Sequence, residues 1–387
     1  MSETPETLLH DDLLERIRTR ASGYDRDNAF FDDDLAELAD AGYLRGLVPE
    51  EFGGLGWNLA DAVRAQFRLA GAAPATALAV NMHLVWTGVA KVLRDRGDDS
   101  LEFVMRVAGE GEVFGFGISE AGNDLMLFGS RSTAEPQADG GYRYTGRKIF
   151  TSLSPAWTRL GTMGLDTESS DAPMLVYGFI DREDPDVRTL DDWDTMGMRA
   201  SQSRTTVLDG AFAAADRVVR RLDPGPNADP LVFGIFACFE LLLGAVYTGI
   251  GARALDLAIA AARRRTSMKA DGRPLADDPD IRRRIADAAL AHDAIEPQLV
   301  ALARDVEAQT DHGRFWFAKL SGVKVRATET AKQVVDQSVR VAGGSSYFAG
   351  SELGRLYRDV LAGVFHPSDD ESAHATIANA WIGPVGG

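Results

Sequence analysis

The sequence predicts an α+β protein that is mainly helical, with a small antiparallel β-domain between two helical domains. Three observations predict this order. Apolar residues recur at helical spacing over residues 1–110, and short segments rich in β-branched and aromatic residues follow over 111–225. Long apolar helical patterns return over 226–387. We expect three domains with these bounds, meeting at one cleft of the kind that commonly holds a cofactor.

Helices in the first domain are predicted from two apolar series. Gly42 follows the second of these series, which ends at Leu38, and a glycine just after an apolar helical pattern commonly ends the helix. Residues 46–57 are rich in Pro and Gly, which predicts a loop before the helical spacing resumes. The series are Leu9, Leu13, Leu14 and Ile17, then Phe31, Leu35 and Leu38.

The middle domain is predicted from segments of strand-like composition separated by Gly, Pro, Asp and Asn. They are EVFGFGIS, GYRYTGRKIFTS, PMLVYGFID and RTTVLDGAF. The turn-rich run DPGPNADP, at 223–230, then leads into the last domain.

The last domain is predicted to be a four-helix bundle with helices near 231–266, 279–309, 314–342 and 369–381. Its longest apolar stretch, 231–252, contains Glu240 and several glycines. Those residues favour a buried core helix over a membrane span.

Composition excludes some functions. Lys and Arg number 41 against 58 Asp and Glu, so the net charge of −17 disfavours nucleic acid as a partner. Because Cys238 is the single cysteine, neither an intrachain disulfide nor a cysteine-based zinc site can form. The sequence predicts no other metal site. The acidic N-terminus is not typical of a signal peptide, so we expect a cytoplasmic protein.

Four motifs occur in order along the chain. They are GLVPEEFGGLG (46–56), ISEAGNDLMLFG (118–129), GRKIFTSLSP (146–155) and DDWDTMGMRASQSRTTVLDGAF (191–212). Together they resemble the acyl-CoA dehydrogenase family over residues 33–383. The resemblance implies bound FAD, an acyl-CoA or other acyl thioester as substrate, and an electron-transfer flavoprotein as acceptor. It also implies a homotetramer, or at least a dimer, with the cofactor at a subunit interface.

The resemblance also implies which residues contact the flavin. Ser119 would face the pyrimidine edge, where hydrogen-bond donors stabilise the reduced ring. Phe150 takes the place of the family's tryptophan and would stack on the flavin, with Thr151 and Ser152 donating toward N5.

A group of arginine and glycine residues in the last domain resembles the residues with which the family contacts the FAD phosphates of a neighbouring subunit. Arginine suits charge-assisted contacts to phosphate, and glycine allows close backbone approach. This chain lacks the family's Phe-Gly after the first arginine, and it lacks the family's Gln before the glycines. These residues therefore leave the choice between FAD and FMN open. The group comprises Arg264, Arg265, Arg340, Gly343 and Gly344.

The catalytic base is missing from its usual place. Counted from Arg358-Asp359, the family's glutamate position is Pro367. Glu240 is one residue from a second position that some family members use, and an unpaired carboxylate in such an apolar segment has a raised pKa. Asp369, Asp370 and Glu371 are nearer the usual position, but Ser368 and Glu371 are spaced as a helix capping box.

Three functions follow from these observations. The first expectation is α,β-dehydrogenation of an acyl thioester with Glu240 as base. The alternative is a two-component flavin monooxygenase on the same fold, served by a flavin reductase. Phe150-Thr151-Ser152 and His366 resemble that branch, in which a histidine helps form a flavin hydroperoxide, and His83 is a second candidate histidine. A non-catalytic flavin- or CoA-binding scaffold is the third.

Overall fold

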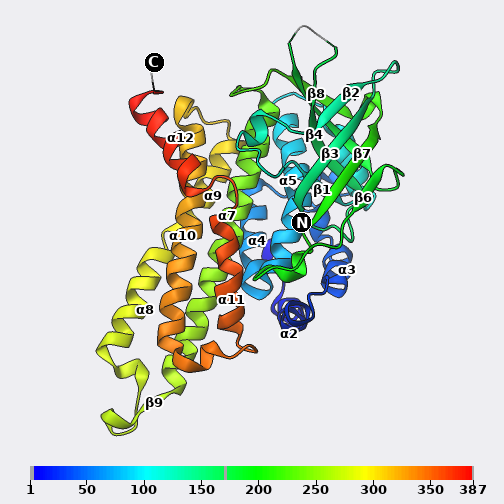
Figure 1. Ribbon diagram of the computed structural model, residues 1–387. Helices are drawn as coiled ribbons and strands as arrows, with labels where there is room; N and C mark the ends of the chain where they lie inside the picture. The colour runs from blue at the N-terminus through cyan, green and yellow to red at the C-terminus, as the bar shows by residue number, and fades with distance from the viewer. Residues whose placement is uncertain (1–3, 170–171, 386–387) are drawn as a thin grey trace.

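The computed structural model describes residues 4–169 and 172–385. Figure 1 shows a sheet on one side, a bundle of long helices on the other, and the N-terminal helices packed beneath and between them. The α+β, mainly helical class predicted from the sequence is confirmed.

The N-terminal helices have capping residues that favour their ends, and one of them ends near Gly42, as predicted. Asn58 and Asp61 form a reciprocal capping box at the start of α4, and Pro74 occupies the first turn of α5, where its missing N–H costs nothing. Gly42 has a φ of 86° just after α3, as expected of a residue that ends a helix. The helices are α1 (Pro5–Leu8), α2 (Asp11–Asp27), α3 (Asp32–Asp40), α4 (Leu59–Ala72), α5 (Pro74–Arg94) and α6 (Glu102–Gly109).

The middle region forms a sheet in which most strands pair antiparallel, as expected, but two pairings are parallel, so the sheet is mixed. β4 runs parallel to β1 and β2 and antiparallel to β5. In the chain, β3 lies between β2 and β4 and runs antiparallel to β2, so β4 returns in the direction of β2 and pairs parallel to it. The order is β6-β7-β3-β2-β4-β5-β8, with β1 beside β4. The strands are β1 (Phe114–Gly117), β2 (Thr133–Pro136), β3 (Tyr142–Thr151), β4 (Arg159–Asp166), β5 (Met174–Asp181), β6 (Val187–Thr189), β7 (Arg204–Ala213) and β8 (Val218–Leu222).

The C-terminal helices differ from the prediction in two places. The helix predicted over 279–309 is two helices, because Pro297 cannot donate the hydrogen bond that would continue α8. A further helix, α11, was missed although Leu353, Leu356 and Val360 have helical spacing. The helices are α7 (Pro230–Arg264), α8 (Pro279–His292), α9 (Ile295–Glu307), α10 (Trp316–Ala342), α11 (Glu352–Val360) and α12 (Asp370–Ile382), with a hairpin of β9 (Thr266–Ser267) and β10 (Arg273–Pro274).

The longest helix, α7, joins the parts of the molecule. It packs against α4 and α5 on one side and against α10 on the other, as Figure 1 also shows. By length and composition α5 and α7 could each cross a membrane, but 94% and 83% of their apolar windows are buried inside the protein. They are core helices, as predicted for 231–252.

Candidate active site

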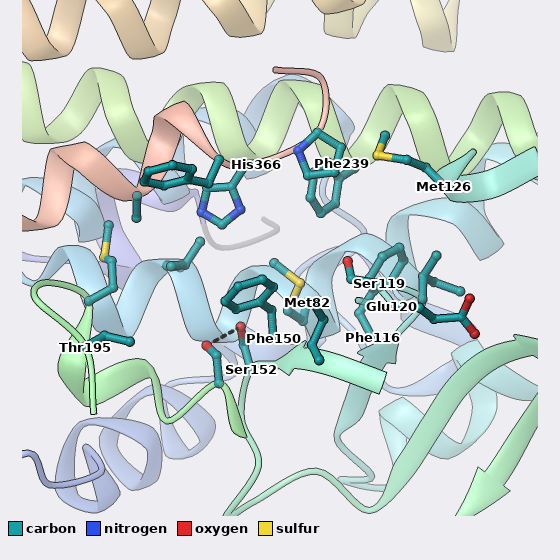
Figure 2. A pocket seen from close by; sticks show the side chains of 18 of the residues that line it. Met82, Phe116, Ser119, Glu120, Met126, Phe150, Ser152, Thr195, Phe239 and His366 are labelled. Carbon is teal, nitrogen blue, oxygen red and sulfur yellow. Dashed lines mark hydrogen bonds between the residues drawn. The ribbon is translucent and has the colours of Figure 1, made fainter. Parts of the chain in front are cut away.

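One cavity of about 460 Å³ lies where the N-terminal helices, the sheet and the bundle meet. Its size is typical of a small-molecule site. Apolar side chains make up most of its wall, and a few polar groups from several elements face it (Figure 2). Of the residues predicted to be functional, Ser119, Phe150, Ser152, Glu240 and His366 line it.

The segments that follow β3 and precede β7 contribute a short chain of hydroxyl groups to the cavity. The Oγ atoms of Ser152 and Ser203 are 2.8 Å apart, and Ser203 is 2.7 Å from Ser201. Figure 2 shows the first of these hydrogen bonds at the cavity wall. Linked hydroxyls polarise one another, so this chain can present a donor at its cavity end. Thr151 does not line the cavity; its hydroxyl is buried and has no partner within the described residues.

Phe150 is turned into the cavity by an unusual backbone conformation. Its φ is 56°, which a bulky residue adopts rarely, and the pairing of β3 with β7 is irregular between Lys148 and Thr151. The ring is 56% exposed and meets Trp193 edge-on, with centroids 6.2 Å apart. The two rings leave apolar surface available to a planar ligand.

The opposite wall is part of the segment 361–369, which connects α11 to α12. Lys324 of α10 holds this segment by donating to the carbonyl oxygens of Gly363, His366 and Ser368, at 3.1, 2.7 and 2.7 Å. The Lys324 side chain is almost completely buried, and burial lowers its pKa to about 8 against the raising effect of Glu240.

Glu240 of α7 reaches the same segment. Its Oε1 accepts hydrogen bonds from the backbone N–H of Ser368 at 3.0 Å and from the Ser368 hydroxyl at 2.8 Å. The other oxygen, Oε2, is buried without a partner in the described part of the chain. Burial raises the pKa of Glu240 to about 7, although Lys324 opposes that shift.

The contact between Ser368 and Glu240 corrects the expected capping box. Asp369, rather than Ser368, caps α12, and its carboxylate accepts the N–H of Ser372. The Ser368 side chain is occupied with Glu240 and lies 3.1 Å from the Ser321 hydroxyl. Long-range contacts therefore override the local capping pattern.

His366 stands across the cavity from Ser152 (Figure 2). Its Nε2 is buried and has no hydrogen-bond partner among residues 4–169 and 172–385. Burial, reinforced by the charge of Lys324, lowers the pKa of His366 to about 3. The imidazole is therefore neutral at physiological pH.

His83 is structural, so its candidacy as a second active-site histidine was wrong. The ring is buried in α5, with Nδ1 accepting the N–H of Phe114 at 3.0 Å and Nε2 lying 2.7 Å from the carbonyl oxygen of Leu44. Both nitrogens are thus used to join α5 to neighbouring segments, and His83 does not line the cavity.

The predicted phosphate-binding group lies outside this cavity. Arg265 follows α7 and donates to the carbonyl oxygens of Val341 (3.2 Å) and Ala342 at the end of α10. Arg340 pairs with Asp336, and Arg264 is exposed. These residues, with Gly343 and Gly344, gather where α7 and α10 end, whereas the cavity lies near the start of α7.

Several lining residues were not predicted as site residues. Trp193, Met196 and Arg358 come from a loop and a helix that meet only in the folded chain. The Arg358 Nε donates to the Met196 carbonyl oxygen at 2.9 Å, and its guanidinium also pairs with Asp25. The sequence did offer one signal for these site residues, which is an apolar Trp and Met within the Asp-rich run at 191–197.

Comparison with known proteins defines the class to which this fold and cavity belong. Residues 9–100 match the family model of the acyl-CoA dehydrogenase N-terminal domain, and residues 241–370 match that of the C-terminal domain. The chain belongs to the acyl-CoA dehydrogenase family.

Its relatives include proteins named as nitrososynthases and one named as a putative acyl-CoA dehydrogenase. It is 31% identical to the amino sugar nitrososynthase DnmZ of Streptomyces peucetius, over 92% of this chain and 88% of that protein. It is 27% identical to the putative acyl-CoA dehydrogenase YdbM of Bacillus subtilis, over 95% and 94% of the two chains. A structure of KijD3 in complex with FMN and a dTDP-linked amino keto sugar matches with a TM-score of 0.81, at 28% identity over 97% of this chain and 93% of that one.

Proposed function

We propose that the protein is a reduced-flavin-dependent monooxygenase. The observation that carries the proposal is His366. Its buried Nε2 has no hydrogen-bond partner among the described residues, and the side chain stands opposite Ser152 while Pro367 occupies the usual base position. Relatives named as nitrososynthases support it, because a nitroso group contains a nitrogen–oxygen bond. This reverses the order of the two reactions expected from the sequence.

The residues around the cavity fit a flavin ring. Phe150 and Trp193 offer aromatic surface, and Ser119 and Ser152 offer hydroxyl groups at its edge. A reduced flavin held there would supply the two electrons needed to split O₂ between the substrate and water. FMN is bound by the related KijD3, and it is our first choice of flavin over FAD.

His366 is suited to holding a proton near the reacting atoms. A neutral imidazole carries one N–H and one lone pair, so it can donate or accept a hydrogen bond without bringing charge into the cavity. The apolar walls around it keep out water, and water would divert the oxidising equivalents to hydrogen peroxide.

The test supplies the protein with FMN, a flavin reductase, NADH and ¹⁸O₂, and offers it a panel of small nucleophilic substrates. We expect ¹⁸O in a product, detected by mass spectrometry. His366→Gln should lower product formation on the order of 100-fold, the scale of a lost proton-transfer group, and raise hydrogen peroxide release, with FMN affinity unchanged. A flavin band that an acyl-CoA bleaches without oxygen would contradict the proposal.

Dehydrogenation of an acyl thioester is the second candidate, and Glu240 favours it. A cavity-lining carboxylate with a pKa near 7 has the properties of a base that removes an α-proton. An electron-transfer flavoprotein would then accept the electrons. Glu240→Gln should abolish anaerobic bleaching by an acyl-CoA in that case. A non-catalytic scaffold, the third possibility, would neither bleach nor oxygenate.

We also propose that two or four copies assemble. Arg264 and Arg340 are exposed and lie away from the cavity of their own chain, so they could meet a flavin phosphate only in another copy. A cytoplasmic location stays a prediction from the sequence.

A further inference from the structure

Methionine side chains are concentrated around the cavity. Of the nine methionines in the chain, four are among the described residues that line it. Met82 comes from α5 and Met126 from the segment between β1 and β2, and Figure 2 shows both at the cavity. Met196 and Met198 come from the segment between β6 and β7. A thioether is flexible and suits an apolar wall, but it is also a group that peroxide oxidises.

These four side chains differ in how much of their surface is covered. Met82 is 4% exposed and Met198 is 1% exposed, so neighbouring atoms cover nearly all of both. Met126 is partly exposed, and Met196 is 60% exposed. An oxidant has to touch the sulfur atom in order to react with it. Met196 therefore offers the most accessible thioether among the four.

The backbone around Met196 is anchored, so its exposed side chain does not belong to a loose loop. The carbonyl oxygen of Met196 accepts a hydrogen bond from Arg358 Nε at 2.9 Å. The carbonyl oxygen of Thr195 accepts one from Arg199 Nη1 at 2.7 Å. These contacts keep the Met196 side chain at the cavity wall.

We propose that Met196 is a site of oxidative modification, where hydrogen peroxide formed in the cavity converts the thioether to a sulfoxide. This inference rests on the proposed monooxygenase function, because that reaction brings reduced flavin and O₂ together in the cavity. When no substrate takes up the oxygen, reduced flavin and O₂ give oxidised flavin and hydrogen peroxide.

The modification balances with hydrogen peroxide as the oxidant. A lone pair of the Met196 sulfur forms a bond to one oxygen atom of the peroxide, and the O–O bond breaks. The second oxygen atom takes up the proton of the first and leaves as water. The sulfur is oxidised by two electrons, and the peroxide is reduced by two.

The sulfoxide changes the chemistry of the cavity wall. Its S=O group is polar, whereas most of the side chains around it are apolar. A polar group that loses water without gaining a partner should weaken the binding of an aromatic ring by about tenfold. Oxidation of Met196 would therefore weaken flavin binding and shut down a protein that turns over without substrate.

The first experiment uses hydrogen peroxide alone and needs no turnover. The protein without added FMN is treated with H₂O₂, and each methionine is followed by peptide mass spectrometry. The affinity for FMN is then measured by quenching of flavin fluorescence. We expect Met196 to be oxidised ahead of Met198, and the affinity of the wild type for FMN to fall about tenfold.

Two variants identify the methionine responsible. Met196→Leu has a side chain of similar size without sulfur, so its affinity for FMN should be the same before and after treatment. Met268 is 98% exposed and lies beyond the end of α7, away from the cavity. Met268→Leu should lose affinity on treatment as the wild type does. A Met196 that resists peroxide overturns the inference, and so does an equal loss in Met196→Leu and the wild type.

The second experiment tests where the peroxide forms. The protein receives FMN, a flavin reductase, NADH and ¹⁸O₂ without substrate, and catalase destroys any peroxide that reaches bulk solution. We expect severalfold more ¹⁸O-labelled sulfoxide at Met196 than at Met268, although Met268 is the more exposed of the two. Equal labelling of the two methionines would mean that the oxidant comes from bulk solution, which contradicts the inference.

Failure of this inference differs from failure of the proposed function. A product labelled with ¹⁸O in the oxygenation test, together with an unlabelled Met196 here, would overturn the inference alone. If the monooxygenase proposal itself is wrong, neither a product nor Met196 acquires ¹⁸O, although added peroxide still oxidises Met196 in the first experiment.

Discussion

Buried charged side chains in this protein differ in how many of their polar atoms have hydrogen-bond or ion-pair partners. Glu120 and Lys148 are both buried, and their charged atoms are 2.6 Å apart. Glu120 also accepts hydrogen bonds from Ser130, Arg131 and Ser132, while Lys148 donates to a backbone carbonyl oxygen. Burial alone would raise the pKa of Glu120, but Lys148 and these donors lower it to about 2. This pair supports the structure next to Ser119, whereas Glu240 Oε2 and His366 Nε2 have no hydrogen-bond partner among the described residues.

His83 should make the stability of the protein depend on pH. Burial lowers the pKa of His83 in the folded protein from 6.5 to about 4. Between these pH values the unfolded chain binds a proton at His83 that the folded protein does not bind. Its contribution is therefore present above pH 6.5 and lost as the pH falls toward 4, by about 3 kcal/mol at most. His83→Gln should flatten the dependence of the free energy of unfolding over this range, measured by urea denaturation. Parallel curves for the variant and the wild type would refute the assignment.

The elements around the cavity hold one another through close backbone contacts. The loop before β7 rests on α11, where the Met198 N–H donates to the Asp359 carboxylate at 2.6 Å. A Cβ added to Gly197 would lie 2.3 Å from the Arg358 carbonyl oxygen, so only glycine permits this approach. The loop supplies Thr195, Met196 and Met198 to the cavity wall.

Gly197→Ala should push this loop away from α11 and open the cavity. We expect a loss of roughly 1–3 kcal/mol in the free energy of unfolding, as for other overpacked sites. We also expect weaker FMN binding, measured by quenching of flavin fluorescence. Gly350→Ala is the control, because no atom of the residues that the structure describes lies within 4 Å of the added Cβ. If Gly197→Ala behaves like this control, the loop does not shape the site.

At the scale of the whole molecule, the cavity and the predicted phosphate-binding group lie in different parts of one chain. The cavity uses the start of α7, and Arg264 lies at its other end. A net charge of −17 also disfavours anionic ligands except where basic groups gather. A flavin phosphate would therefore draw its cations from a second copy, as proposed above.

Complementation between variants tests this assembly. The double variant Arg264→Ala, Arg340→Ala should bind FMN weakly with an unchanged melting temperature, since both side chains are exposed. His366→Ala should bind FMN but not oxygenate. When equal amounts of the two variants are refolded together as dimers, about one quarter of the sites should combine an intact His366 from one chain with intact arginines from the other. Activity that stays at the sum of the separate variants would show that each site is built from one chain.

The sequence by itself determined the class of fold and most of the helices and strands. Those features follow from local periodicity, and α7 is an example, because its apolar run and the Asp229-Pro230 start are both visible in the residues. Five cavity residues were also found from motifs that lie within single segments. The sequence analysis predicted neither the mixed pairing of β4 nor the break between α8 and α9.

Only the tertiary structure decided what the polar candidates do. His83 and His366 are both histidines in apolar surroundings. Backbone groups bind both nitrogens of His83, but within the described part of the chain Nε2 of His366 has no partner. Ser368 was a helix cap by local pattern, but it donates to Glu240 instead. The reason is physical: a hydrogen bond depends on which groups distant in the sequence come within 3 Å, and local spacing carries no information about that.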